Sequence, residues 1–317
     1  AMLSFSDVPD GFVMKLMEQT GGNPLFVVET LKTLEDDGII RNCGESWVIK
    51  TTNFDRIDIP HRMEDILGKR LEKLEPVKLE LLEVLSVLDT PANPKFVQKL
   101  KRFQEIPILV ELRNLEQTGL VAKTFEGGKL HFQIAQPKVR EIVYGKIADE
   151  KRQRYHGEIG DLYSETFRGR ESEILEELAY HYRYSDKPRK AIDMAIRAGD
   201  RLKKIYANER AYQFYSYVLE KVEGVEDCFE MWVETQEKLG DLCTTMGKYD
   251  EADGSCSFLQ KDEVRDRLDT LRVIKIFLAR GKVFEIQGDY EFALKCYKDA
   301  RSYLSGFEKT EFVVERT

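Results

Sequence analysis

The sequence predicts a mainly α protein that contains several domains and ends in helical repeats. The length of 317 residues exceeds the usual size of one hydrophobic core, so two or three domains are expected. Hydrophobic residues make up 42% of the chain and charged residues 33%, with only nine prolines. This composition suits helices with one buried stripe rather than disorder or a β-sandwich. Small residues also recur at a fixed spacing in the C-terminal half, which favours stacked helix pairs.

A sharp turn, Gly21-Gly22-Asn23-Pro24, is the first feature of the chain, and a helical pattern from Val27 to Leu34 follows it. The two glycines free the backbone, Asn23 can cap a helix, and Pro24 presets φ at a first helical position. This pattern predicts a hinge that directs a helix out of a bend.

The next stretch predicts a hairpin, an extended piece and a helix. Apolar runs at 38–40 and 46–49 flank the polar turn at 42–45, as in a short hairpin. Residues 57–60 end in a proline, which keeps the preceding residue out of the α region. A helix is then expected because apolar residues and one arginine recur at helical spacing: Met63, Ile66, Leu67, Arg70, Leu71 and Leu74.

The turn at Gly22-Asn23-Pro24 and the later Arg70-Leu71-x-x-Leu74 resemble the small helical domain of the signal-transducing ATPases with numerous domains (STAND), the AAA-type class of the maltose regulator and apoptosome-type switches. In that class a Gly-x-Pro turn touches the adenine of a nucleotide that another domain holds. The resemblance therefore implies that Gly22 and Pro24 contact ATP or ADP only together with an ATPase domain. This sequence has no Gly-x-x-x-x-Gly-Lys-Ser/Thr loop, so no cofactor is expected for the chain alone. The alternative is that Pro24 only starts a helix.

Residues 78–132 read as three helices followed by a hairpin, the order of a winged helix. The helices are expected over 79–88, 95–101 and 106–117, and the hairpin turns at Glu126-Gly127-Gly128. A DNA-binding module would place the third helix in the major groove. That helix offers Arg113 against two glutamates, too little cation for several phosphates, so a structural winged helix is favoured over a DNA reader.

A basic cluster follows the winged helix and is read as a solvated helix face rather than a ligand surface. Its members are Lys138, Arg140, Lys146, Lys151, Arg152 and Arg154.

The C-terminal part has an internal period of 41 residues. Each glycine of the period precedes an alanine by 12 residues, and an aromatic residue or cysteine follows. This spacing resembles the tetratricopeptide repeat (TPR), in which a small residue on the first helix of a pair faces a small residue on the second. The packing residues are therefore predicted to be Gly199, Ala211, Gly240, Ala252, Gly281 and Ala293.

The period exceeds the usual TPR length of about 34, which we assign to longer helices and looser connections. A partial copy around Leu178, Tyr182 and Ala191 places the start of the repeats near Ser172. Residues 311–314 look like the opening of a further repeat, so the chain is expected to be a fragment.

No catalytic constellation is found in the sequence, and the chain is not expected to be an enzyme. The histidines His61, His131, His156 and His181 are scattered singly, without metal-ligand spacing. Five cysteines form no Cys-x-x-Cys pair and read as reduced, mostly buried thiols. The net charge of −8 disfavours nucleic acid and anionic membranes, and no apolar run or leader directs the chain to a membrane. A cytoplasmic location is expected.

The predicted domains are a helical hinge with a hairpin at 1–57, a winged helix at 58–148, a connecting helix at 149–171 and TPR-like repeats at 172–317. The order implies a non-catalytic regulatory fragment of an ATP-dependent switch. A protein partner or small inducer would bind the repeats, and the ATPase domain would be linked covalently. Two alternatives stay open: a transcriptional regulator whose winged helix binds DNA, and a pure TPR scaffold.

Overall fold

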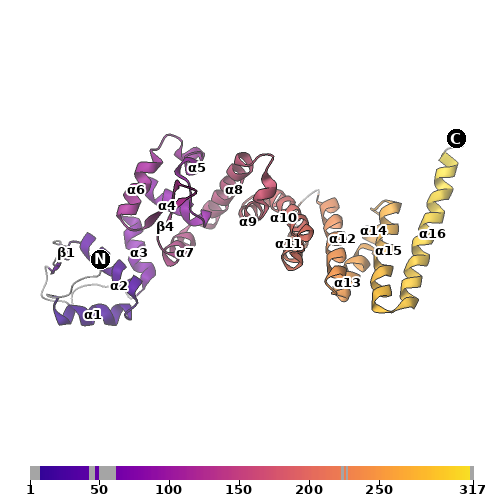
Figure 1. Cartoon of the computed structure of the whole chain (residues 1–317), viewed down its shortest axis with the longest axis horizontal. Coiled ribbons are helices and arrows are strands. Elements are labelled where there is room, and N and C mark those ends of the chain that lie inside the picture. The colour runs from indigo at the N-terminus through magenta and orange to yellow at the C-terminus, as the bar shows by residue number, and fades with distance from the viewer. Residues whose placement is uncertain (1–7, 43–46, 50–61, 223–224, 226–227, 315–317) are drawn as a thin grey trace. The chain divides into compact units, whose positions relative to one another are not determined.

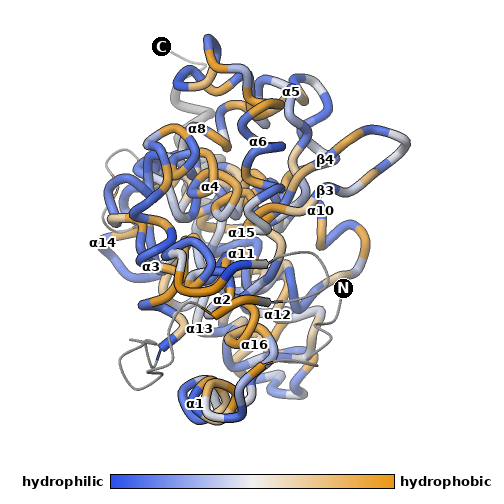
Figure 2. Tube along the Cα trace, turned by 90° about the vertical axis from the view of Figure 1, so that its left-hand side faces the viewer, coloured by the Kyte–Doolittle hydropathy of each residue, from blue (hydrophilic) through white to orange (hydrophobic). Residues whose placement is uncertain are grey.

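The computed structural model describes residues 8–42, 47–49, 62–222, 225 and 228–314 (Figure 1). The chain divides into two compact units, residues 1–149 and 150–317, which we describe separately. Helices dominate both units, so the mainly α fold class is confirmed. In Figure 2, hydrophobic and hydrophilic stretches alternate along the helices, as expected for helices with one buried stripe.

The first unit contains seven α-helices and two hairpins among its described residues. The helices are α1 (Asp10–Thr20), α2 (Pro24–Asp36), α3 (Met63–Glu72), α4 (Pro76–Leu88), α5 (Pro94–Val97), α6 (Ile108–Gln117) and α7 (Pro137–Lys146). The hairpins pair β1 (Ile40–Asn42) with β2 (Trp47–Ile49), and β3 (Val121–Glu126) with β4 (Lys129–Ile134), all antiparallel.

The glycine-proline turn forms as the sequence predicts. Gly21 and Gly22 have φ of 60° and 71°, which a residue with a Cβ rarely adopts. The Asn23 side chain accepts hydrogen bonds from the backbone of Leu25 at 3.0 Å and Phe26 at 3.4 Å. Pro24 occupies the first position of α2. The predicted extended piece at 57–60 and the tip of the first hairpin lie outside the described residues.

Helix α4 is the centre of the second half of this unit, and it packs against α6, α7 and β4. Leu81, Leu82 and Leu85 are buried on it, and Leu112, Leu115 and Phe132 are buried on the neighbouring elements. Ala92 pairs with Phe132 through backbone hydrogen bonds of 2.8 and 2.9 Å, which adds a short third segment beside the hairpin. Three helices and a hairpin thus follow one another in the predicted order.

The helix predicted over 95–101 was too long. Helix α5 ends at Val97, and a 3₁₀ turn spans Lys101–Phe103. Leu100 between them is extended, with ψ of 130°. Both Leu100 and Phe103 are buried, so the fold departs from the helix in order to place two apolar side chains in a small core.

The second unit consists of helices joined mostly by short connections, as Figure 1 shows for the pairs α12–α13 and α15–α16. Its helices are α8 (Asp149–Thr166), α9 (Leu175–Arg183), α10 (Pro188–Lys204), α11 (Asn208–Lys221), α12 (Phe229–Thr245), α13 (Tyr249–Leu259), α14 (Asp262–Arg265), α15 (Thr270–Gln287) and α16 (Tyr290–Val314). Helix α10 packs against both α9 and α11, so it serves two pairs as the sequence suggested.

Three helix pairs repeat with the 41-residue period: α10–α11, α12–α13 and α15–α16. The second helix of a pair packs on the first helix of the next, α11 on α12 and α13 on α15. Residues 311–314 continue α16, so the prediction that they open a further repeat is wrong. The helix continues through Gly306, and a short apolar run such as 312–314 extends a helix as readily as it begins one.

Candidate functional site

The glycine-proline turn is accessible in the structure. Pro24 and Asn23 are exposed, whereas Phe26 at the first turn of α2 is buried. A Cβ on Gly22 would lie 3.2 Å from the Met17 side chain, so α1 closes over this part of the turn. The nucleotide contact implied for Gly22 and Pro24 stays a prediction, because the turn supplies a surface and no phosphate-binding group.

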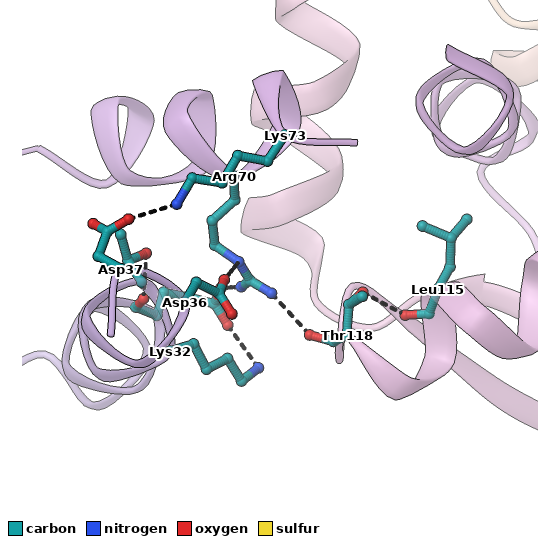
Figure 3. Close-up of polar contacts among 9 residues, drawn as sticks. Lys32, Asp36, Asp37, Arg70, Lys73, Leu115 and Thr118 are labelled. Atoms are coloured by element: carbon teal, nitrogen blue, oxygen red, sulfur yellow. Dashed lines mark hydrogen bonds and ion pairs between the residues drawn. The ribbon is translucent and has the colours of Figure 1, made fainter. Parts of the chain in front are cut away.

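A buried polar cluster, the Arg70 cluster, joins three elements of the first unit (Figure 3). Arg70 on α3 and Glu29 on α2 form an ion pair with side chains only 6% and 2% exposed. The same guanidinium donates to the backbone carbonyl of Thr118, just after α6, at 2.8 Å. Lys32 also reaches Glu29, at 3.0 Å. Because a buried charge is costly without partners, this cluster fixes α2, α3 and the end of α6 together.

The Arg70 cluster has an exposed neighbour. Lys73, one turn after Arg70, pairs with Asp37 at 2.6 Å, and both side chains are more than 40% exposed. An exposed ion pair of this kind contributes little to stability. Sequence reasoning placed Arg70 on the helix, but nothing in the sequence pointed to Glu29 as its partner 41 positions away.

In the repeats, the predicted glycines and alanines lie inside the helix pairs. Ala211, Ala252 and Ala293 are at most 3% exposed. The glycines, however, face larger neighbours than the alanines. A Cβ on Gly199 would lie 2.5 Å from the Tyr215 ring, and a Cβ on Gly281 would lie 2.4 Å from the Tyr297 ring.

The second repeat pair packs differently at its glycine. The atoms nearest to a Cβ on Gly240 belong to Ser255, at 3.4 Å, and to the backbone of Ala252, at 3.7 Å. Two of the three glycines therefore pack against a tyrosine ring. The sequence predicted instead that a small residue on the first helix faces a small residue on the second.

The same packing also occurs one step upstream, between α8 and α9. A Cβ on Gly160 would lie 3.0 Å from the Tyr182 ring. The step of 12 residues from glycine to alanine does not find this copy. Here 22 residues separate Gly160 from Tyr182, whereas 16 separate Gly199 from Tyr215. The dipeptide Gly-Asp at 160–161, 199–200 and 240–241 was the available signal.

The aspartate after the glycine holds the tyrosine hydroxyl. Tyr182 donates to Asp161 at 3.0 Å, and Tyr215 donates to Asp200 at 2.7 Å. Burial, and then this hydrogen bond, raises the pKa of both tyrosines above the ordinary value, so they remain donors. Each aspartate also binds a lysine: Lys190 reaches Asp161 at 2.7 Å, and Lys238 of the next pair reaches Asp200 at 2.7 Å.

A groove of about 560 Å³, the inner groove, is lined mainly by α12 and α15, and also by Lys203 of α10 and by Cys256 and Leu259 of α13. Its lining mixes charged side chains with apolar ones such as Ile276 and Val283. The charged side chains that line it are Lys203, Glu234, Glu237, Lys238, Asp241, Lys275 and Lys282. Repeat proteins commonly bind partners on concave surfaces of stacked helix pairs.

Some cations between α4 and β4 and in the basic cluster form ion pairs or hydrogen bonds within the chain. Lys123 on β3 pairs with Glu116 on α6 at 2.9 Å. Arg140 donates to the Ser86 carbonyl at 2.8 Å and pairs with Asp89 at 2.8 Å. These contacts leave fewer cations for phosphates, and they support the structural interpretation of both features.

Two histidines that the sequence showed as isolated come together in the structure. His156 on α8 and His181 on α9 are almost fully buried, with their Nδ1 atoms 3.1 Å apart. Burial, and then the neighbouring His156, lowers the pKa of His181 to about 3. Within the described residues no group of three metal-ligating side chains occurs. His61 and Cys43 lie outside those residues.

The described cysteines, Cys228, Cys243, Cys256 and Cys296, are buried free thiols. Burial raises the pKa of Cys243 to about 11 and that of Cys256 to about 12, which makes both poor nucleophiles. In the part of the chain that the structure covers, no helix is both long enough and apolar enough to cross a bilayer.

No protein-family model matches the chain, and no curated protein matches it either. Solved structures with which it shares helical-repeat similarity include MamA, at 15% identity over 51% of this chain and 98% of that chain, with a TM-score of 0.32. BtubC from P. vanneervenii is 14% identical over 76% of this chain and 92% of that chain, with a TM-score of 0.39.

A STAND protein with a tetratricopeptide repeat sensor from Pyrococcus horikoshii is 15% identical, with a TM-score of 0.34. The match covers 96% of this chain and 52% of that chain, about half of its length. None of these values carries a functional argument. By its own helix pairs and 41-residue period, the second unit is a TPR-like helical repeat.

Proposed function

We propose that this chain is a non-catalytic, regulatory and protein-interaction part of a larger ATP-dependent switch of the STAND class. A partner or inducer binds the TPR-like repeats, and the first unit transmits the change to a covalently linked ATPase domain. The observation that carries the proposal is the inner groove, a concave surface with several charged side chains that is lined by α12, α13, α15 and Lys203 of α10. Repeat proteins commonly bind partners on such surfaces.

The first unit supplies the features that a hinge needs. Its glycine-proline turn is exposed, and the helix that leaves the turn is locked to α3 and the end of α6 through the Arg70 cluster. A movement of α2 would therefore displace α3 and the end of α6, and with them the predicted winged-helix region. In this proposal Gly22 and Pro24 meet the nucleotide only when the ATPase domain is present, and the protein works in the cytoplasm.

The interaction role is tested with the chain itself. A random peptide library is selected on the immobilised chain, and the recovered peptides are titrated by calorimetry. We expect peptides whose binding is weakened by substitutions in the inner groove and unaffected by substitutions on α1. Peptides that bind equally well to groove variants, or an absence of any selected peptide, would contradict the role.

The switch role is tested in the protein that joins this chain to its ATPase domain. The affinity for a selected peptide should differ between the ATP-bound and ADP-bound states by a coupling of about 1–3 kcal/mol. An affinity that is independent of nucleotide would favour a pure scaffold. The isolated chain should show no heat of ATP binding, because it lacks a phosphate-binding loop.

A further inference from the structure

The inner groove changes its charge pattern from one helix pair to the next. On α12 and α15, three positions that line it are spaced as i, i+4 and i+7, which puts them on one side of a helix. On α12 these positions hold Glu234, Lys238 and Asp241, and the positions 41 residues earlier on α10, which do not line the groove, hold Asp193, Arg197 and Asp200. On α15 the same positions hold Lys275, Ala279 and Lys282. The three positions thus change from acid, base and acid on α12 to base, alanine and base on α15.

The acids of the first two pairs are neutralised within the protein. Lys238 reaches Glu234 at 2.7 Å and Asp200 at 2.7 Å, and Lys203 reaches Asp241 at 3.4 Å. The remaining acid of the lining, Glu237, is held by Arg272 at 2.9 and 3.0 Å.

The two lysines of α15 have no such compensation. No ion pair or hydrogen bond of the Lys275 or Lys282 side chain occurs among the described residues. The residue between them is Ala279, which cannot neutralise them. Tyr297, whose counterpart Tyr215 donates to the aspartate after the glycine, donates instead to Glu285 at 2.7 Å. The tyrosine therefore does not require an acid at position 282, and the lysine there is available to the groove.

We propose that the inner groove binds an acidic, extended peptide segment whose carboxylates meet Lys275 and Lys282. The inference rests on the proposed interaction function and names the class of partner. Seven residues of α-helix separate the two lysines by about 10 Å along the axis. On a chain in the extended polyproline II conformation, which has three residues per turn and rises about 3.1 Å per residue, carboxylates three residues apart lie on one side and are separated by about 9 Å. Since the acids of the lining are already paired, the two lysines set the local charge.

The test uses the whole chain and fluorescein-labelled octaglutamate, with octaglutamine as the uncharged comparison, in fluorescence anisotropy at low and high salt. The informative variant, K275E/K282D, restores the acidic pattern of α12 in the third pair. The matched control, K295E/K298D, makes the same charge change on α16, outside the groove. Circular dichroism melting checks that both variants fold.

We expect octaglutamate to bind, octaglutamine not to bind, and K275E/K282D to weaken binding at least tenfold while K295E/K298D changes it less than twofold. High salt should weaken binding to the wild-type chain. Equal losses in the two variants would mean that net charge and not the groove attracts the peptide, and would overturn the inference. Equal binding of both peptides, or no binding of octaglutamate, would overturn it as well.

The acidic partner and the general interaction role can be tested separately. Neutral or basic peptides selected at the groove, together with no octaglutamate binding, would refute the acidic partner and leave the interaction role intact.

Discussion

At the scale of single residues, the closest packing in the repeats is between a glycine and a tyrosine ring. The ring of Tyr215 covers Gly199 and donates to Asp200, and the ring of Tyr182 covers Gly160 and donates to Asp161. In each contact a tyrosine ring packs on the glycine, and the tyrosine hydroxyl donates a hydrogen bond to the aspartate that follows. Glycine is therefore required here for space and not for its backbone conformation.

Substitution of Gly199 by Ala should destabilise the second unit, because the new Cβ would lie 2.5 Å from the Tyr215 ring. Overpacking of this kind costs about 1–3 kcal/mol, and the unit should melt several degrees lower. The control is G254A in α13, where a Cβ meets nothing within 4 Å. That variant should be unchanged or slightly more stable, since alanine favours a helix. Equal thermal midpoints for the two variants would refute the packing assignment.

The buried histidine pair predicts a loss of stability in acid. His181 has a pKa of about 3 in the folded chain against about 6.5 when unfolded. A lowered histidine pKa means that the unfolded state binds the proton more readily. The stabilisation is therefore complete above about pH 6.5 and falls as the pH drops toward 3. One proton changes the unfolding free energy by about 1.4 kcal/mol per pH unit.

Urea unfolding at several pH values tests this point. We expect the free energy of unfolding of the second unit to fall less steeply below pH 6 in H181F than in the wild-type chain. The control H131F alters a histidine on β4 in the first unit, and should leave the slope of the second unit unchanged. Parallel slopes for H181F and the wild-type chain would show that the pair does not titrate on unfolding.

At the scale of elements, the Arg70 cluster determines how α2 meets α3. The substitution R70M should destabilise the first unit by about 3–5 kcal/mol, because it leaves the Glu29 carboxylate buried without its main partner. The double variant E29M/R70M should be more stable than R70M, since both charges are removed. Urea unfolding followed by hydrogen exchange of the backbone amides in α2, α3 and α6 measures the first unit alone.

The exposed pair provides the comparison for the Arg70 cluster. K73M removes the partner of Asp37 and should cost less than about 1 kcal/mol. A K73M variant as unstable as R70M, or a double variant no better than R70M, would show that burial does not decide the contribution of these ion pairs.

At the scale of the whole molecule, the net charge of −8 and the paired cations of the first unit predict no DNA binding. A labelled duplex of about 30 base pairs should show no change in anisotropy with this chain at 50 mM salt, where phosphate contacts are strongest. A basic DNA-binding protein serves as the positive control. A change in anisotropy that weakens steeply between 50 and 200 mM salt would instead support the transcriptional alternative.

The sequence alone determined most of the secondary structure and the periodic part of the fold. The capped turn at Asn23-Pro24, the helix carrying Arg70 and the helix pairs around Ala211, Ala252 and Ala293 follow from local chemistry and counted spacing. These signals are local or repeat at a fixed interval, so a single sequence contains them. The end of α5 did not follow, because burial of Leu100 and Phe103 overrides a helical pattern.

Only the tertiary structure decided which side chains meet. Glu29 and Arg70, His156 and His181, and Gly160 and Tyr182 are separated by 41, 25 and 22 positions, without a shared pattern that marks them as partners. The groove is a similar case. The lysines of α15 are visible in the sequence, but only the folded structure shows that no described carboxylate forms an ion pair with them. Contacts between distant positions depend on how helices pack, and packing is a property of the folded chain as a whole.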